Sequence, residues 1–218
     1  MTNTLRDSRV QTVLDRLFAD AEHDDDRFAR LKPELNFQPG AASAQQLSDT
    51  AAEILMPVSR SGGELLYTLV RAIRPSTVVE FGTSFGISTL YLAAAVRDNG
   101  VGRVIGTELS EAKLAAARAN LAAAGVADLV EIRAGDARQT LSDLDGPIGL
   151  LLLDGWKDLC LPILRLLEPQ LPAGAMVVAD DTTFVSLGEY LRYVRDPENG
   201  YQSVAFPVED GMELSCRV

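Results

Sequence analysis

The fold is decided by the stretch VVEFGTSFGIST, residues 78–89. An apolar, β-branched run turns through Gly82 and Gly86 and leads into a helical pattern from Ser88 to Val96. A buried parallel strand followed by a helix has this pattern. Glycine lets the backbone turn tightly and approach a ligand, and the N-terminus of the following helix presents free N–H groups to it. Glu80, an acid in an otherwise apolar strand, is expected to face this ligand.

The glycine spacing of this turn narrows the choice of ligand. After Gly82-x-x-x-Gly86 no third glycine falls where a dinucleotide fingerprint needs one, which disfavours a pyrophosphate ligand. The pattern E-x-G-x-x-x-G at a first strand instead resembles motif I of the class I S-adenosylmethionine (SAM) methyltransferases. A glycine turn in any α/β domain is the alternative, and the rest of the chain decides between the two.

The amino-acid composition is that of an ordinary globular protein. The 218 residues suffice for one large core, and 47% of them are hydrophobic. No apolar run reaches the length of a membrane span, and the polar N-terminus lacks a hydrophobic signal segment. Two cysteines suit a reducing compartment, so a cytoplasmic protein is expected. A net charge of −11 repels nucleic acid and anionic membranes, which favours small-molecule partners.

The N-terminal third shows only helical spacing. It predicts helices over the ranges 5–31 (broken at 22–26), 43–55 and 64–73, with a loop over 33–40. The single histidine, His23, stands beside an acidic run and is expected to be solvated, which disfavours His-based zinc sites and triads. Residues 1–60 are interpreted as a helical cap or substrate lid, and 61–218 as the SAM-binding core of the same single domain.

Strands and helices alternate from Thr77 onward. Strands are predicted over 78–81, 103–107, 129–133, 148–153 and 175–179, and helices over 87–96, 111–124, 137–144, 159–167 and 185–194. Asp210-Gly211 joins the last two runs, 202–208 and 212–218, as in a β-hairpin. This order indicates a doubly wound, Rossmann-like α/β sheet of seven strands, mainly parallel with an antiparallel last strand. Ligands bind such sheets at the carboxyl ends of the strands.

Acidic residues recur directly at these strand ends. A carboxylate at Glu108 can accept both hydroxyls of a ribose. The alternative, an exposed acid before a helix, is less favoured because Ser110 already serves as the cap of that helix. Asp136 can lie near an adenine amino group, or it can cap the helix that begins at Ala137. Both interpretations of Asp136 stay open.

Asp154, Asp180 and Asp181 place three carboxylates on neighbouring strand ends. They cannot all be ionised close together without a compensating cation, and hard oxygen ligands suit Mg²⁺ or another divalent ion. The alternative is that Asp154 alone is functional and Asp181 caps a turn. Lys157 can take a proton from a substrate hydroxyl if a nearby cation lowers its pKa, or it can form a salt bridge to an aspartate. Trp156 is expected to form a wall against a planar substrate rather than core.

A second resemblance begins at this loop. The segments DGWKDxxLP (154–162), LLE (166–168), LxxG (171–174) and ADD (179–181) resemble the cation-dependent class I O-methyltransferases of the catechol and caffeoyl-CoA type. The likeness runs from about Met56 to the C-terminus.

The resemblance implies a role for each matching residue. The implied cofactor-binding residues are Met56, Val58, Glu80, Gly82, Ser84, Ser88, Glu108, Asp136, Ala137 and Asp154. Lys157 is the implied base, Trp156 and Met56 contact substrate, and Asp154, Asp180 and Asp181 hold the metal. Two positions depart from the family. Asp181 stands where Asn is usual, and Phe206 stands near the place of a substrate-binding glutamate, with Glu209 close by in sequence.

The resemblance therefore implies methyl transfer from SAM to a hydroxyl of a small, catechol-like phenol with Mg²⁺ or another divalent cation, by a homodimer. A metal-independent N- or O-methyltransferase is the first alternative. A catalytically silent SAM-binding protein is the second, and the presence of Lys157 argues against it. A nicotinamide-dependent oxidoreductase is less favoured, because the glycine pattern is wrong for it.

Overall fold

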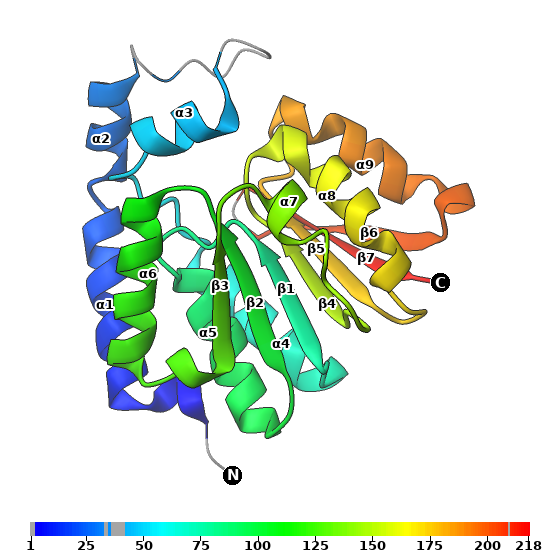
Figure 1. Cartoon of the computed structure of the whole chain (residues 1–218), viewed down its shortest axis with the longest axis horizontal. Helices are drawn as coiled ribbons and strands as arrows, with labels where there is room; N and C mark the ends of the chain where they lie inside the picture. Colours follow the sequence, from blue (N-terminus) through cyan, green and yellow to red (C-terminus); the bar gives the residue numbers. More distant parts are fainter. Residues whose placement is uncertain (1–2, 33–34, 36–41, 209) are drawn as a thin grey trace.

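The computed structural model describes residues 3–32, 35, 42–208 and 210–218. Its centre is one seven-stranded sheet with the order β3-β2-β1-β4-β5-β7-β6 (Figure 1). The strands are β1 Thr77–Phe81, β2 Arg103–Glu108, β3 Val130–Ala134, β4 Leu150–Leu153, β5 Met176–Asp180, β6 Tyr201–Phe206 and β7 Met212–Arg217. Only β7 runs antiparallel to its neighbours, β5 and β6. The predicted fold class is thereby confirmed.

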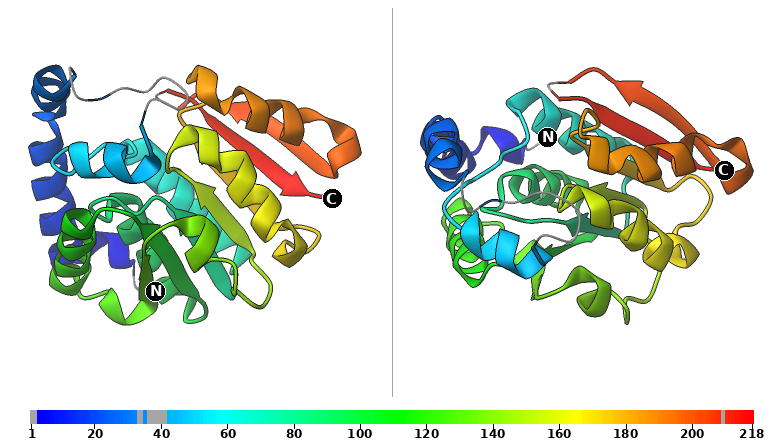
Figure 2. Two further views of the ribbon diagram at one scale, coloured as in Figure 1. Left: turned by 45° about the horizontal axis from the view of Figure 1, so that its top comes forward. Right: turned by 90° about the horizontal axis from the view of Figure 1, so that it is seen from above.

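Helices cover both faces of the sheet (Figure 2). Those on one face contribute to the larger core cluster and are α1 Ser8–Ala21, α4 Arg60–Ile73, α5 Ile87–Asn99 and α6 Glu111–Ala124. Those on the other face are α7 Ala137–Thr140, α8 Cys160–Leu167 and α9 Gly188–Arg195. Two more, α2 Asp24–Leu31 and α3 Ala44–Thr50, follow α1. None of the described helices is both long and apolar enough to cross a membrane.

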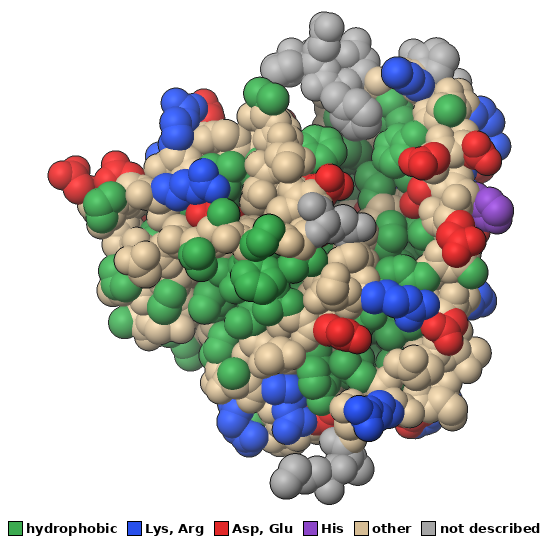
Figure 3. All heavy atoms as spheres, turned by 180° about the vertical axis from the view of Figure 1, so that it is seen from behind, with side chains coloured by type: hydrophobic (Ala, Val, Ile, Leu, Met, Phe, Trp, Pro, Cys, Tyr) green, Lys and Arg blue, Asp and Glu red, His purple; other side chains and the backbone are tan. Residues whose placement is uncertain are grey.

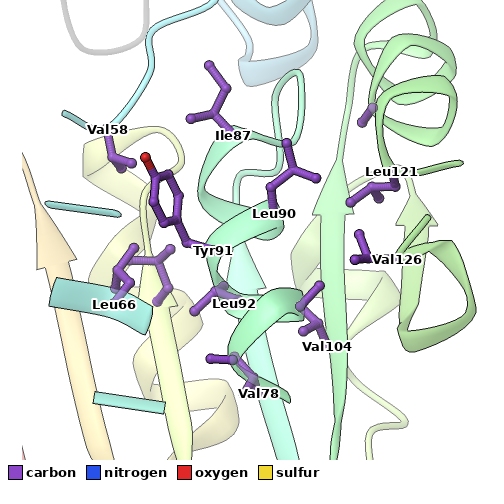
Figure 4. Packing of buried hydrophobic residues seen from close by; sticks show 14 of the residues in the cluster. Val58, Leu66, Val78, Ile87, Leu90, Tyr91, Leu92, Val104, Leu121 and Val126 are labelled. Carbon is purple, nitrogen blue, oxygen red and sulfur yellow. The ribbon is translucent and has the colours of Figure 1, made fainter. Parts of the chain in front are cut away.

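The two core clusters follow from the alternation of side chains along a strand. Val78 of β1 points into the larger cluster, and Val79 points into the smaller one. Figure 4 shows Val78 and Val104 of the sheet packed beneath Leu90 and Leu92 of α5. Because β4 is buried on both faces, all four of its residues are leucine. This buried sheet gives a rigid edge from which the site residues project.

Several helix boundaries differ from the sequence prediction; α7, for example, ends at Thr140 rather than at residue 144. Two of the differences have identifiable reasons. The helix predicted over 43–55 ends at Thr50, and the N–H groups of Leu55 and Met56 donate instead to the carboxylate of Asp24. The helix predicted from residue 64 begins at Arg60, because the Ser59 hydroxyl accepts a hydrogen bond from the Gly62 N–H at 3.0 Å. The loop predicted over 33–40 falls, apart from Leu35, outside the described residues.

The surface carries mixed charge. In the view from behind, acidic and basic side chains lie interspersed (Figure 3). His23 is exposed, as expected for a solvated residue. Hydrophobic side chains also gather on this face.

The chain reverses its direction of winding between β1 and β4. It leaves β1 toward β2 and β3, then crosses to β4 and β5 on the other side. The loops after β1 and β4 therefore lead to helices on opposite faces of the sheet, α5 on one face and α8 on the other. Ligands bind sheets of this kind between two such loops, at the carboxyl ends of the strands.

Candidate functional site at the carboxyl edge of the sheet

The glycine turn after β1 lies directly against the loop after β4. Gly82 has a φ of +97°, and a Cβ added there would stand 2.6 Å from the carbonyl oxygen of Asp154. A Cβ on Gly155 would meet the ring of Phe81 at 2.6 Å. The two backbones therefore approach as closely as they do because both positions are glycine.

Glu80 lies beneath this turn and has no exposed surface. Its carboxylate accepts hydrogen bonds from three hydroxyls, those of Thr83 at 2.9 Å, Ser88 at 2.6 Å and Thr89 at 2.5 Å. Burial raises the pKa of Glu80 to about 7, although these hydroxyls act in the opposite direction. In this structure the carboxylate faces these hydroxyls, and a contact of Glu80 with a ligand stays a prediction. Glu80 and Ser88 anchor the turn from below.

Glu108 joins the same turn to the start of α6. Its Oε2 accepts the N–H of Ser84 at 2.7 Å, and its Oε1 accepts the N–H of Ser110 at 2.8 Å. Ser84 adopts a left-handed conformation with a φ of +48°, and its hydroxyl donates to the carbonyl of Leu55 at 2.8 Å. Ser110 also caps α6, as predicted. The predicted ribose acid is therefore held in place by two backbone donors.

A pocket of about 590 Å³ opens beside Glu108. This volume is ordinary for a small-molecule site. It is lined by α3 and the residues after it, the end of β2, the loop after β2, the first turn of α6 and the end of β3. The lining residues are Gln45, Asp49, Ala52, Glu108, Leu109, Ser110, Glu111, Ala112, Leu114, Ala134 and Gly135. The contribution of α3 is absent from the sequence prediction, because nothing local indicates that this helix reaches β2.

Lys113 is another residue that the sequence prediction omits. Only 3% of it is exposed, and its ammonium lies 5.8 Å from the centroid of the Phe85 ring. Burial lowers the pKa of Lys113 to about 8, while Glu108, Asp24 and Asp154 act in the opposite direction. Nothing in the local sequence at the first turn of α6 indicates that this lysine is buried. The structure thus adds a buried positive charge near Glu108, the predicted ribose-binding acid.

Asp136 caps the short helix α7. Its side chain accepts the N–H of Arg138 at 2.9 Å and forms an ion pair with the Arg138 guanidinium. The hydrogen bond from that guanidinium lowers the pKa of Asp136. Ala137 follows as a buried residue, and Gly135 lines the pocket. The structure thus shows the capping role, and a contact of Asp136 or Ala137 with adenine stays a prediction.

The second group of acids gathers after β4 and β5 around one lysine. Lys157 Nζ lies 3.1 Å from Asp154 Oδ1 and 2.9 Å from Asp181 Oδ2. Asp181 is left-handed, with a φ of +60°, and its N–H donates to Asp180 Oδ1 at 3.0 Å. The salt bridge left open for Lys157 is present, with two aspartates rather than one.

The charges of this group are unbalanced. Burial raises the pKa of Asp154 to about 6, with Lys157 acting in the opposite direction. Burial and the neighbouring Asp154 and Asp181 raise the pKa of Asp180 to about 8. Burial alone would lower the pKa of Lys157, but the two carboxylates outweigh it and raise the pKa above its ordinary value. The predicted base is therefore held as an ammonium in this arrangement.

For a metal ion, the arrangement of these side chains and the chemistry of their donor atoms point in different directions. Among the residues described, no three His, Cys, Asp or Glu side chains stand in an arrangement that could hold a metal ion. The Lys157 ammonium instead bridges Asp154 and Asp181. The donor chemistry does fit, because three carboxylates against one ammonium leave negative charge that a hard divalent ion would neutralise.

The remaining predicted residues divide between core and surface. Val58 is 3% exposed and packs in the larger core cluster, and its contact with the cofactor stays a prediction. Met56 is 38% exposed and left-handed, with a φ of +47°. Trp156 packs against the small apolar cluster of the cap, which contains Leu35, Ala51 and Ile54. It is therefore in part a core residue, a role that the prediction set aside. Glu209 lies outside the described residues.

Comparison with known proteins places these residues in a recognisable context. A family model described as a methyltransferase domain matches residues 79–182, a range that contains the strand ends from Glu80 to Asp181. The catechol O-methyltransferase of Mycobacterium tuberculosis is 35% identical over 144 residues, which are 66% of this chain and 64% of that protein. Catechol O-methyltransferase B of Danio rerio is 30% identical over 177 residues, which cover 75% of this chain and 66% of that protein. The chain thus spans just under two thirds of each relative.

A solved structure shows the same fold over nearly its whole length. The crystal structure of a cofactor-bound protein from MTB superimposes with a TM-score of 0.69 at 29% identity, covering 89% of this chain and 97% of that one.

Proposed function

Because the chain belongs to the class I O-methyltransferase family, we propose that it transfers a methyl group from SAM to a hydroxyl of a small, catechol-like phenol. The observation that carries this proposal is the pairing of two acid groups at one sheet edge. Glu108 borders a pocket of suitable size at the end of β2, and the Asp154–Lys157–Asp181 group follows β4 and β5, on the other side of β1. One group suits a methyl donor with a ribose, and the other suits an acceptor with acidic hydroxyls.

Two features of the cofactor side, the placement of Glu108 and the glycine turn, support SAM as its ligand. Glu108 can accept ribose hydroxyls while the Ser84 and Ser110 N–H groups hold its carboxylate. The glycine turn, which Glu80 anchors, lets the backbone approach the methionine part closely. Positioning of donor and acceptor in line would supply much of the rate acceleration.

On the acceptor side, Asp154, Asp180 and Asp181 would hold a divalent ion. Such an ion, when bound, polarises acceptor hydroxyls and favours their ionised form. Lys157 would then take the hydroxyl proton on Nζ. This requires that Asp154 and Asp181 no longer stabilise its ammonium, because burial then favours the neutral amine. Trp156 and the exposed Met56 would flank the acceptor.

A metal-independent methyltransferase is the second candidate, and a specific observation favours it. The Lys157 ammonium already bridges two of the three proposed ligands, so a cation stands there without any metal. Such an enzyme would act on an oxygen or nitrogen acceptor through positioning alone. A homodimer, implied by the family resemblance, is part of the proposal and can be checked by light scattering.

The deciding experiment assays methyl transfer from labelled SAM to caffeoyl and dihydroxybenzoyl compounds, with Mg²⁺ and then with EDTA. The proposal expects methylated product with Mg²⁺, loss of activity in EDTA, and recovery when Mg²⁺ is restored. Full activity in EDTA would contradict the metal role and support the second candidate. Tight SAM binding without turnover across a broad panel of phenols would instead indicate a silent SAM-binding protein.

A further inference from the structure

Asp24, the first residue of α2, is a buried carboxylate in the part of the chain that resembles the family least. Only 8% of the residue is exposed. Its oxygens accept the N–H of Leu55 at 2.9 Å and the N–H of Met56 at 2.9 Å. The guanidinium of Arg27 donates to the same carboxylate at 2.9 Å. A buried acid with this set of donors binds the segment before α4 to the start of α2.

The segment that Asp24 holds has an unusual backbone. Met56 has a φ of +47°, in the left-handed region that a residue with a long side chain rarely adopts. Such a conformation persists only where surrounding contacts over-determine it. The N–H of Met56 and that of the preceding residue, Leu55, both donate to Asp24. Asp24 therefore maintains the bend.

The same segment is connected by hydrogen bonds through Ser84 to Glu108, the predicted ribose-binding acid. The carbonyl of Leu55 accepts the hydroxyl of Ser84 at 2.8 Å, and the N–H of Ser84 donates to Glu108 at 2.7 Å. Ser84 is itself left-handed, with a φ of +48°. Hydrogen bonds thus connect α2, the segment before α4, the turn after β1 and the end of β2. We name the set Asp24, Leu55, Ser84 and Glu108 the cap relay.

We propose that Asp24 is a positioning residue for the cofactor site, which fixes Ser84 and Glu108 through the cap relay before SAM binds. The proposal rests on the proposed function only in naming SAM as the ligand of Glu108. A site that is already ordered loses less conformational freedom on binding, so its affinity is higher. Loss of the Asp24 charge should therefore weaken SAM binding without touching the groups that contact it.

The chain offers a matched control for this idea. Asp25 is the next residue of α2, lies in the same first helical turn and is exposed. Asp24→Asn keeps the shape but removes the charge that holds the two N–H groups, whereas Asp25→Asn removes an equal charge at the surface. We expect the dissociation constant for SAM, measured by calorimetry, to rise about tenfold for Asp24→Asn and less than twofold for Asp25→Asn.

A purely structural role would give a different pattern. If Asp24 only anchors the cap, Asp24→Asn will lower the melting temperature while the folded protein binds SAM with wild-type affinity, and the proposal is overturned. The proposal also expects kcat at saturating SAM to stay near wild type while the KM for SAM rises. Failure of the wild-type protein to bind SAM would instead defeat the proposed function itself.

A second variant keeps the test decisive if Asp24→Asn does not fold. Ser84→Ala removes the link to Leu55 from the other end of the cap relay and leaves Asp24 intact. We expect it to weaken SAM binding as well. Where both variants fold, their effects in the double variant should be less than additive, because each breaks the same connection. Full additivity, or unchanged SAM affinity in Ser84→Ala, would show that the relay does not act on the cofactor site.

Discussion

The two acid groups at the sheet edge balance their charge in opposite ways. On the cofactor side, Glu80 and Glu108 are satisfied by neutral donors, three hydroxyls for the first and two N–H groups for the second. On the acceptor side, Asp154 and Asp181 form ion pairs with the ammonium of Lys157, and Asp180 adds a third carboxyl group beside them.

The cofactor side is therefore preformed, whereas the acceptor side carries more negative than positive charge. Neutral donors fix a carboxylate without adding charge, so the cofactor side holds its shape on its own. A group of carboxylates with too few cations raises the pKa of its members and favours whatever positive charge can enter. Substitutions on the two sides should therefore affect different steps, binding on one side and turnover on the other.

The largest effect is expected on the acceptor side. Lys157→Met removes the proton acceptor and keeps the length of the side chain, so kcat should fall by a factor of about 10² to 10⁴. SAM affinity, measured by calorimetry on the same variant, should stay near wild type. Turnover within threefold of wild type would remove Lys157 from the mechanism.

The next effect is expected on the cofactor side. Glu108→Gln removes the charge that accepts the Ser84 and Ser110 N–H groups, and SAM affinity should fall about 10- to 100-fold. Methyl transfer at saturating SAM should be largely retained. A fall in kcat with unchanged SAM affinity would reverse the assignment of the two sides.

A smaller effect concerns stability and pH. The pKa of Glu80 is raised to about 7, so the native state binds its proton more tightly than the unfolded chain does. This stabilisation is present at low pH and is lost as pH rises from the ordinary value of 4.5 through about 7. Glu80→Gln stays neutral, so relative to wild type it should gain on the order of 1 to 3 kcal/mol between pH 4.5 and 8 in urea unfolding. Parallel stability curves for the two proteins would contradict the raised pKa of Glu80.

The smallest effect separates the two interpretations of Asp136. Asp136→Ala removes the cap of α7 and should cost about 1 kcal/mol of unfolding free energy, whereas Asp136→Ser keeps a capping oxygen and should cost less. SAM affinity should change less than twofold in both variants if capping is the whole role. Weaker SAM binding by both would show that the carboxylate also contacts the adenine.

Local patterns allowed most of the fold to be predicted. The apolar runs of the strands, the glycine turn and the Ser110 cap all depend on near neighbours in sequence, so the elements from Thr77 onward were predicted to within a few residues. The acids at the strand ends were found in the same way, since parallel strands bring their carboxyl ends to one edge.

The sequence by itself determined which elements form and which acids meet at the sheet edge. Only the tertiary structure decided what each acid does there. Glu80 is buried under hydroxyls, Lys157 lies between two aspartates, and Asp24 reaches a segment 31 residues away. The state of a carboxylate depends on its burial and on the donors around it. Those donors come from elements far apart in the chain, whose contacts no local pattern encodes.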